Sequence, residues 1–80
     1  MMQVSFDPQY NIAYIKLKDK SGNVNSVQLT PDVILDLAPD GSLYGIELLN
    51  AKKQLLGDKP EKLRLLNELT GVEKEFELPF

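Results

Sequence analysis

The stretch Val33-Ile-Leu-Asp-Leu-Ala-Pro-Asp-Gly-Ser-Leu-Tyr-Gly-Ile-Glu-Leu-Leu49 decides the fold of this chain. Two apolar runs, rich in residues that favour strands, flank the turn-forming residues 39–42. Pro39 fixes its own φ, and Asp40 and Gly41 tolerate the positive φ that a tight hairpin turn requires. The stretch therefore predicts two antiparallel strands joined by a hairpin loop.

A loop of either two or four residues gives the same register in this hairpin. The pairs on one face are then Leu37 with Tyr44, Leu35 with Ile46, and Val33 with Leu48. On the other face Asp36 lies opposite Gly45, and Glu47 is its diagonal neighbour. The hairpin is expected to have one apolar face that belongs to the core and one mixed face.

Composition limits both the size of the core and the chemistry. The 80 residues form a single domain, 1–80, whose core is thin enough that a partner subunit would help it. The chain has no cysteine and no histidine, which excludes disulfides, thiolate metal sites and the commonest general base. The net charge of −3 and the single arginine, Arg64, argue against nucleic-acid binding.

The apolar segments of the sequence indicate where in the cell the protein is expected. The N-terminal residues Met-Met-Gln-Val-Ser have no signal-peptide pattern, and no apolar run is long enough to span a membrane. We therefore expect no membrane association and a cytoplasmic protein.

Three further strands are expected before the central hairpin. Residues 2–6 and 12–18 alternate apolar and polar side chains around a turn that Asp7-Pro8 initiates, and residues 24–29 form a weaker strand. Short turns join all of these strands. Residues 2–49 are therefore predicted to form an antiparallel meander of about five strands in chain order.

The last third of the chain is expected to cover this sheet. After one short helical turn that follows Asn50, Pro60 and Glu61 indicate the start of a helix over residues 60–70, ended by Gly71. The leucines of this segment fall mostly on one stripe; they are Leu63, Leu65, Leu66 and Leu69. Residues 72–80 return to alternation as a sixth strand or an arm. The predicted fold class is α+β, with one C-terminal helix packed on one face of the meander.

Two carboxylate patterns are candidates for chemistry. Asp36, Asp40, Gly41 and Glu47 match positions of a calcium-binding loop, but a hairpin would separate Asp40 from Glu47 by about 15–20 Å, too far for one ion. Asp36 and Glu47 should lie about 7–8 Å apart on one face. If partly buried, they could act as an acid/base pair or bind a hard cation; on a solvated face they would pair with lysines such as Lys16 or Lys18.

Several separated motifs resemble a known family. They are Phe6-Asp7-Pro8, Ala13-Tyr-Ile-Lys-Leu17, Val33-Ile-Leu-Asp36 and Asp40-Gly-Ser-Leu-Tyr-Gly-Ile-Glu-Leu-Leu49 with Ala51. This combination, over about residues 2–56, is similar to a family of short prokaryotic proteins catalogued as a domain of unknown function. The family often has Asp where this chain has Asn11. The resemblance implies a small β-rich domain without an established activity, and it marks Asp7, Tyr14, Asp36, Gly45 and Glu47.

These observations favour a small, non-enzymatic module for protein interaction or self-association, most simply a homodimer. Catalytic residues, cofactors and metal ligands are not expected. The alternative is a minimal carboxylate enzyme or divalent-cation site built on Asp36 and Glu47. The candidate functional residues are Asp36, Glu47, Asp7 and Tyr14.

Overall fold

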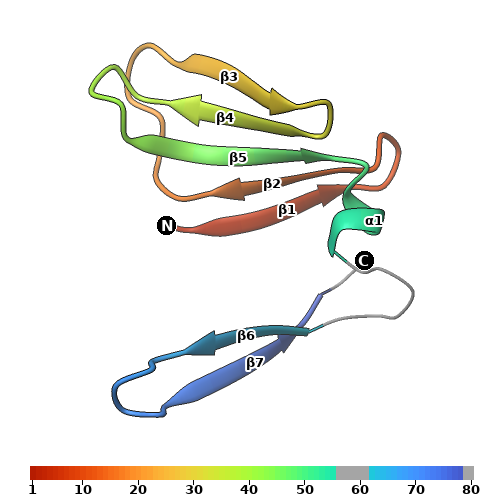
Figure 1. Cartoon of the computed structure of the whole chain (residues 1–80), viewed down its shortest axis with the longest axis vertical. Helices are drawn as coiled ribbons and strands as arrows, with labels where there is room; N and C mark the ends of the chain where they lie inside the picture. Colours follow the sequence, from red (N-terminus) through yellow and green to blue (C-terminus); the bar gives the residue numbers. More distant parts are fainter. Residues whose placement is uncertain (56–61, 79–80) are drawn as a thin grey trace.

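The computed structural model describes residues 1–55 and 62–78, which are mostly β (Figure 1). One antiparallel sheet of five strands and a separate two-stranded hairpin contain nearly all of the regular structure. The strands are β1 (Gln3–Asp7), β2 (Ile12–Lys16), β3 (Asn25–Thr30), β4 (Val33–Leu37), β5 (Leu43–Leu49), β6 (Lys62–Leu66) and β7 (Glu73–Glu77). A short helix, α1 (Ala51–Leu55), follows β5, as expected for the residues after Asn50.

The hairpin of β4 and β5 forms with most of its predicted register. Val33 pairs with Leu48, Leu35 with Ile46, and Asp36 with Gly45. The loop, however, consists of the three residues 39–41, between Ala38 and Ser42. Ala38 N–H donates to Ser42 O (2.8 Å), Gly41 N–H donates to Ala38 O (2.9 Å), and Gly41 has φ 89°. Leu37 therefore pairs with Leu43, and the pairing of Leu37 with Tyr44 was wrong. The register shift between Asp36 and Leu37 then restores the predicted pairs.

The order of strands in the sheet is β1-β2-β5-β4-β3, so the prediction of a meander in chain order was wrong. The chain leaves β2, passes to the far edge as β3, and returns through β4 to place β5 beside β2 (Figure 1). This arrangement places the longest strand, β5, at the centre of the sheet. It pairs Ala13 with Leu48 and Ile15 with Ile46, so that both strands contribute to one apolar face.

The two faces of the sheet differ sharply in polarity. The register places on one face, called here the apolar face, the side chains of Val4, Phe6, Ala13, Ile15, Val27, Val33, Leu35, Leu37, Ile46 and Leu48. Its polar exceptions, Asn25 and Thr30, lie at the two ends of edge strand β3. The opposite face, called here the polar face, carries Ser5, Tyr14, Ser26, Asp36 and Glu47 and also includes the apolar residues Ile12, Ile34 and Leu49.

The C-terminal third contradicts the predicted α+β class. Residues 62–66 form β6 instead of part of a helix over residues 60–70, and β6 pairs with β7. The alternation of Lys62, Leu63, Arg64 and Leu65 explains the difference, because it gives a strand one charged and one apolar side. Across the hairpin, Lys62 and Arg64 each lie 3.9 Å from a β7 carboxylate, of Glu75 and Glu73 respectively, but these exposed ion pairs contribute little by themselves.

The segment predicted to end that helix is instead the hairpin loop. Asn67 N–H donates to Val72 O (2.9 Å), Gly71 N–H donates to Asn67 O (2.8 Å), and Gly71 has φ 76°. Asn67 Oδ1 also accepts the backbone N–H groups of Leu69 and Thr70. Of residues 72–80, the structure forms a strand over Glu73–Glu77, while residues 79–80 lie outside the described part.

Helix α1 is fixed to the turn between β1 and β2. Asn11, which has φ 55°, accepts from Lys52 N–H through its side chain (3.0 Å) and from Ala51 N–H through its carbonyl (2.9 Å). Ala51 is fully buried. The residues described include no helix with the length and hydropathy of a membrane span.

We expect Gly41→Val to destabilise the protein by about 1–2 kcal/mol, because a β-branched residue resists the positive φ of this position. A Cβ at Gly41 would contact no other group, so the penalty is one of backbone conformation alone. Gly41→Asn is the matched control, since Asn tolerates this conformation. Urea unfolding of the variants measures the difference; equal midpoints for Val and Asn would contradict this account of the turn.

Candidate functional site

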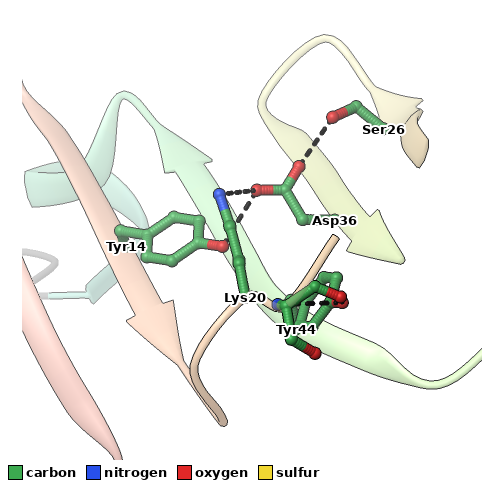
Figure 2. A network of polar contacts seen from close by, with 6 residues as sticks. Tyr14, Lys20, Ser26, Asp36 and Tyr44 are labelled. Carbon is green, nitrogen blue, oxygen red and sulfur yellow. Dashed lines mark hydrogen bonds and ion pairs between the residues drawn. The ribbon is translucent and has the colours of Figure 1, made fainter. Parts of the chain in front are cut away.

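The polar face is organised around the carboxylate of Asp36, which is 8% exposed. Its Oδ2 accepts from the Tyr14 hydroxyl (2.9 Å) and lies 3.2 Å from Lys20 Nζ. Its Oδ1 accepts from the Ser26 hydroxyl (2.7 Å). The three donors come from β2, the loop after β2, and β3, and they converge on the carboxylate as Figure 2 shows. We call these four residues the Asp36 cluster.

Tyr14 reaches Asp36 across the central strand. Tyr14 lies on β2 and Asp36 on β4, and the strand between them, β5, presents Gly45 to the same face. A Cβ built on Gly45 would lie 2.5 Å from the Tyr14 hydroxyl oxygen and 2.7 Å from Ile15 O. The missing side chain therefore provides the space over which the tyrosine ring passes.

The electrostatics of the cluster favour an ionised carboxylate. Burial alone would raise the pKa of Asp36, but hydrogen bonds from Ser26, Tyr14 and Lys20 outweigh it and lower the pKa below its usual value. Burial, together with the hydrogen bond to Asp36, raises the pKa of Tyr14. The hydrogen bond to Asp36 likewise raises the pKa of Lys20, whose ammonium also lies 5.2 Å from the centre of the Tyr14 ring. The cluster thus keeps Tyr14 and Lys20 protonated and the Asp36 carboxylate charged.

The loop that supplies Lys20 is anchored by a second tyrosine. Tyr44, 2% exposed, donates its hydroxyl to Ser21 O (3.0 Å) and accepts from Ser21 N–H (3.2 Å). Lys18 Nζ lies 5.4 Å from the centre of the Tyr44 ring and 2.6 Å from the Ser42 hydroxyl. Tyr44 lies between Leu43 and Gly45, where the pairing of β5 with β4 shifts its register. Its hydroxyl therefore holds the β2–β3 loop against the sheet.

The structure brings together only two of the four candidate residues, Asp36 and Tyr14. Glu47 lies on the same face, paired with Tyr14 and Ile34, and the bonds of the Asp36 cluster do not include it. Asp7 lies at the end of β1, where its Oδ1 accepts from the N–H groups of Gln9 (2.8 Å) and Tyr10 (3.4 Å). That contact fits its expected place in the first turn.

Sequence reasoning missed Ser26 and Lys20. Ser26 pairs with Asp36 across the β3–β4 hairpin, so extending the predicted register through residues 30–32 would have found it. Lys20 belongs to a loop, where no periodic pattern fixes the direction of a side chain. The lysine partner anticipated for a solvated face exists, but it is neither Lys16, which pairs with Asp19 (3.0 Å), nor Lys18.

The contacts of the Asp36 cluster hold neighbouring strands and the β2–β3 loop together. Both oxygens of Asp36 are engaged by neutral or cationic donors, and its pKa is lowered, whereas a close carboxylate pair would raise one pKa. Across residues 1–55 and 62–78, no group of three or more acidic side chains could hold a metal ion together.

A comparison with protein families places this sheet in a known group. Residues 3–52 match the family described as "Protein of unknown function (DUF2283)". The matched segment runs from the start of β1 to the first turn of α1 and contains the Asp36 cluster. The hairpin of β6 and β7 lies beyond it. Neither the curated proteins nor the solved structures include a significant match.

Gly45→Ala should destabilise the protein by more than about 2 kcal/mol, because its methyl group would overlap both the Tyr14 ring and the backbone of Ile15. Thermal or urea unfolding measures the loss. The double variant Tyr14→Ser/Gly45→Ala should lose less than the sum of the single losses, since removing the ring removes part of the overlap. Additive losses would show that the two residues do not interact.

Asp36→Asn tests the charge of the cluster. A carboxyl group with a lowered pKa in the folded state contributes stability above its unfolded pKa of 3.8, and this contribution is lost as pH falls through the folded value. We therefore expect the variant to lose about 2 kcal/mol at neutral pH and to show a shallower loss of stability below pH 4. Urea unfolding at several pH values provides the measurement.

Glu47→Gln is the matched control for that experiment, because it removes a carboxylate from the same face outside the cluster. A loss of stability below pH 4 as steep in Asp36→Asn as in the unaltered protein would assign the acid sensitivity to other groups.

Proposed function

We propose, for a chain that belongs to the DUF2283 family of proteins of unknown function, that it is a non-enzymatic structural module that self-associates through the apolar face of its sheet. The observation that carries the proposal is this face itself. A single sheet with one continuous apolar face requires a second layer for stability.

The described part of the chain supplies little of that second layer. Its buried apolar core consists of Ala13, Ala38, Tyr44 and Ala51. The larger side chains of the apolar face are only half-buried or exposed; Val4 and Val27, near the two edges of the sheet, are 43% and 37% exposed. Burial of these groups would stabilise the fold by about 25 cal/mol for each Å² removed from water.

The overall dimensions also support a missing partner. The radius of gyration is 14.2 Å, compared with about 11.6 Å for a compact domain of this length. The accessible surface is 6127 Å², whereas a compact protein of 9.0 kDa exposes about 4,900 Å². The excess, about 1,200 Å² per chain, exceeds the roughly 800 Å² that each partner buries in a standard interface.

A second copy of the chain is the occupant that we propose. The strand residues of the apolar face include no charged side chain; the cations beside it, Lys52 over the Phe6 ring and Lys62 at the hollow, lie at its β1 end, away from β3 and β4. A face of this kind is complementary to itself across a two-fold axis, which is the commonest symmetry of soluble oligomers. The polar face, with its internally paired Asp36 cluster, would remain in solvent.

The alternative function, a carboxylate enzyme or divalent-cation site on Asp36 and Glu47, has less support. The contacts of Asp36 are satisfied by donors within the chain, and they leave the carboxylate without a role as a base. The non-enzymatic character, the cytoplasmic location and the prokaryotic source remain predictions.

Light scattering on the full chain should report about twice the 9.0 kDa chain mass. Val27→Asp should shift this mass toward the monomer, because it places a charge on the apolar face at the β3 edge. Gln28→Asp is the matched control, since it adds the same charge to the neighbouring residue on the opposite face. A monomeric unaltered protein, or equal effects of the two substitutions, would contradict the proposed function.

A further inference from the structure

We infer that the hairpin of β6 and β7 is an exchanged arm, which covers the β3–β4 half of the apolar face in a second copy of this chain. This inference rests on the proposed function and specifies which surface of the partner covers the sheet.

The hairpin has one charged side and one apolar side. The first side, where the ion pairs of Lys62 and Arg64 lie, also carries Leu66 at its loop end; its charged residues are Lys62, Arg64, Glu73, Glu75 and Glu77. The second side carries Leu63 opposite Phe76, and Leu65 opposite Lys74. We call Leu63, Leu65 and Phe76 the arm stripe. A hairpin of two strands is marginal by itself, so an apolar stripe on it requires a surface to pack against.

The chain's own sheet covers this stripe incompletely. Leu63 is 40%, Leu65 55% and Phe76 49% exposed. Figure 1 shows the hairpin beyond α1 on the β1 side of the sheet, as a separate pair of strands. At its base, Leu63 and Leu78 border a hollow of about 290 Å³ whose other walls include Val4 and Ile15. This hollow joins the base of the arm to the apolar face at β1 and β2.

The far half of the apolar face lies out of reach of this contact. Edge strand β3 is four strand positions from β1, which corresponds to about 19 Å at the usual spacing of strands. All six residues of β3 are exposed, and Val27 is its apolar-face residue opposite Leu35. Because a two-stranded hairpin spans only about 10 Å, an arm beside β1 cannot also cover β3 and β4.

A two-fold dimer would cover both the arm stripe and the β3–β4 half of the apolar face. Each chain would contribute an arm stripe to the β3–β4 half of its partner's sheet, while the acidic side of the arm faces solvent. The family match ends at residue 52, so the arm lies outside the matched segment, and exchange would give this segment a function. We place Leu65, the most exposed residue of the arm stripe, against Val27 of the partner.

Cysteine cross-linking tests this placement, because the natural chain has no cysteine. Val27→Cys and Leu65→Cys are prepared separately, mixed as folded full-length proteins and oxidised. We expect a disulfide-linked heterodimer from this mixture. The mixture of Gln28→Cys with Leu65→Cys is the matched control, since Gln28 lies on the opposite face of β3, and it should give at least about tenfold less product.

A charge substitution provides the second readout. Leu65→Asp should weaken self-association by about tenfold or more in sedimentation equilibrium. Leu69→Asp should leave it unchanged, because Leu69 lies in the β6–β7 loop and is 94% exposed. Both positions are accessible in the single chain, so neither substitution removes a core contact.

The outcomes separate this inference from the proposed function. A dimer that Val27→Asp dissociates, but that survives Leu65→Asp and yields no Val27–Leu65 disulfide, would overturn the exchanged arm and retain the apolar face as the interface. A full-length protein that is monomeric at all concentrations would overturn both. Equal cross-linking of Leu65→Cys to Val27→Cys and to Gln28→Cys would also overturn the arm.

Discussion

The buried carboxylate of Asp36 is the interaction on which the arrangement of the sheet depends. It receives donors from β2, from the loop after β2 and from β3, and it lies on β4, so one charge ties together segments on both sides of the central strand. Gly45 is the condition for this contact, because a side chain there would occupy the path of the Tyr14 ring. A charge so placed would be costly without its partners, and removing any donor would leave part of that cost uncompensated. The polar face of the sheet is therefore a specific structure rather than a generic solvated surface.

The polar cluster and the apolar face are complementary consequences of one alternating sheet. Side chains with period two direct Tyr14 and Asp36 to one side, and Ala13, Ile15, Leu35 and Ile46 to the other. The polar side satisfies its groups within the chain. The apolar side does not, because the short helix and the arm supply only partial cover to it. We propose that the molecule interacts through the apolar face, and that the contacts of the polar face fix the shape of the sheet.

The sequence predicted local structure better than long-range arrangement. The turn after Ala38 and the register of Val33 with Leu48 follow from turn chemistry and alternation, and both are found, although the loop has three residues instead of two or four. The place of β5 beside β2 could not be predicted, because a chain-order meander satisfies the same alternation. In residues 60–71, Pro60, Glu61 and Gly71 are compatible with a helix, but the alternation of Lys62, Leu63, Arg64 and Leu65 opposite a glutamate-rich strand decides for a hairpin. The predicted candidates included Asp36 and Tyr14, but the predicted site paired Asp36 with Glu47, and the loop donor Lys20 follows from a fold that was not yet known.

The central claim is that this sheet depends on a second copy of the chain. Native-state hydrogen exchange at a series of protein concentrations tests it most directly, since a fold coupled to association loses protection on dilution. We expect the amides of the inner strands, β2, β5 and β4, to exchange faster as the protein is diluted through its dissociation constant. Protection of these amides that stays constant over the whole series would contradict the claim, and would show that a single chain stabilises the sheet by itself.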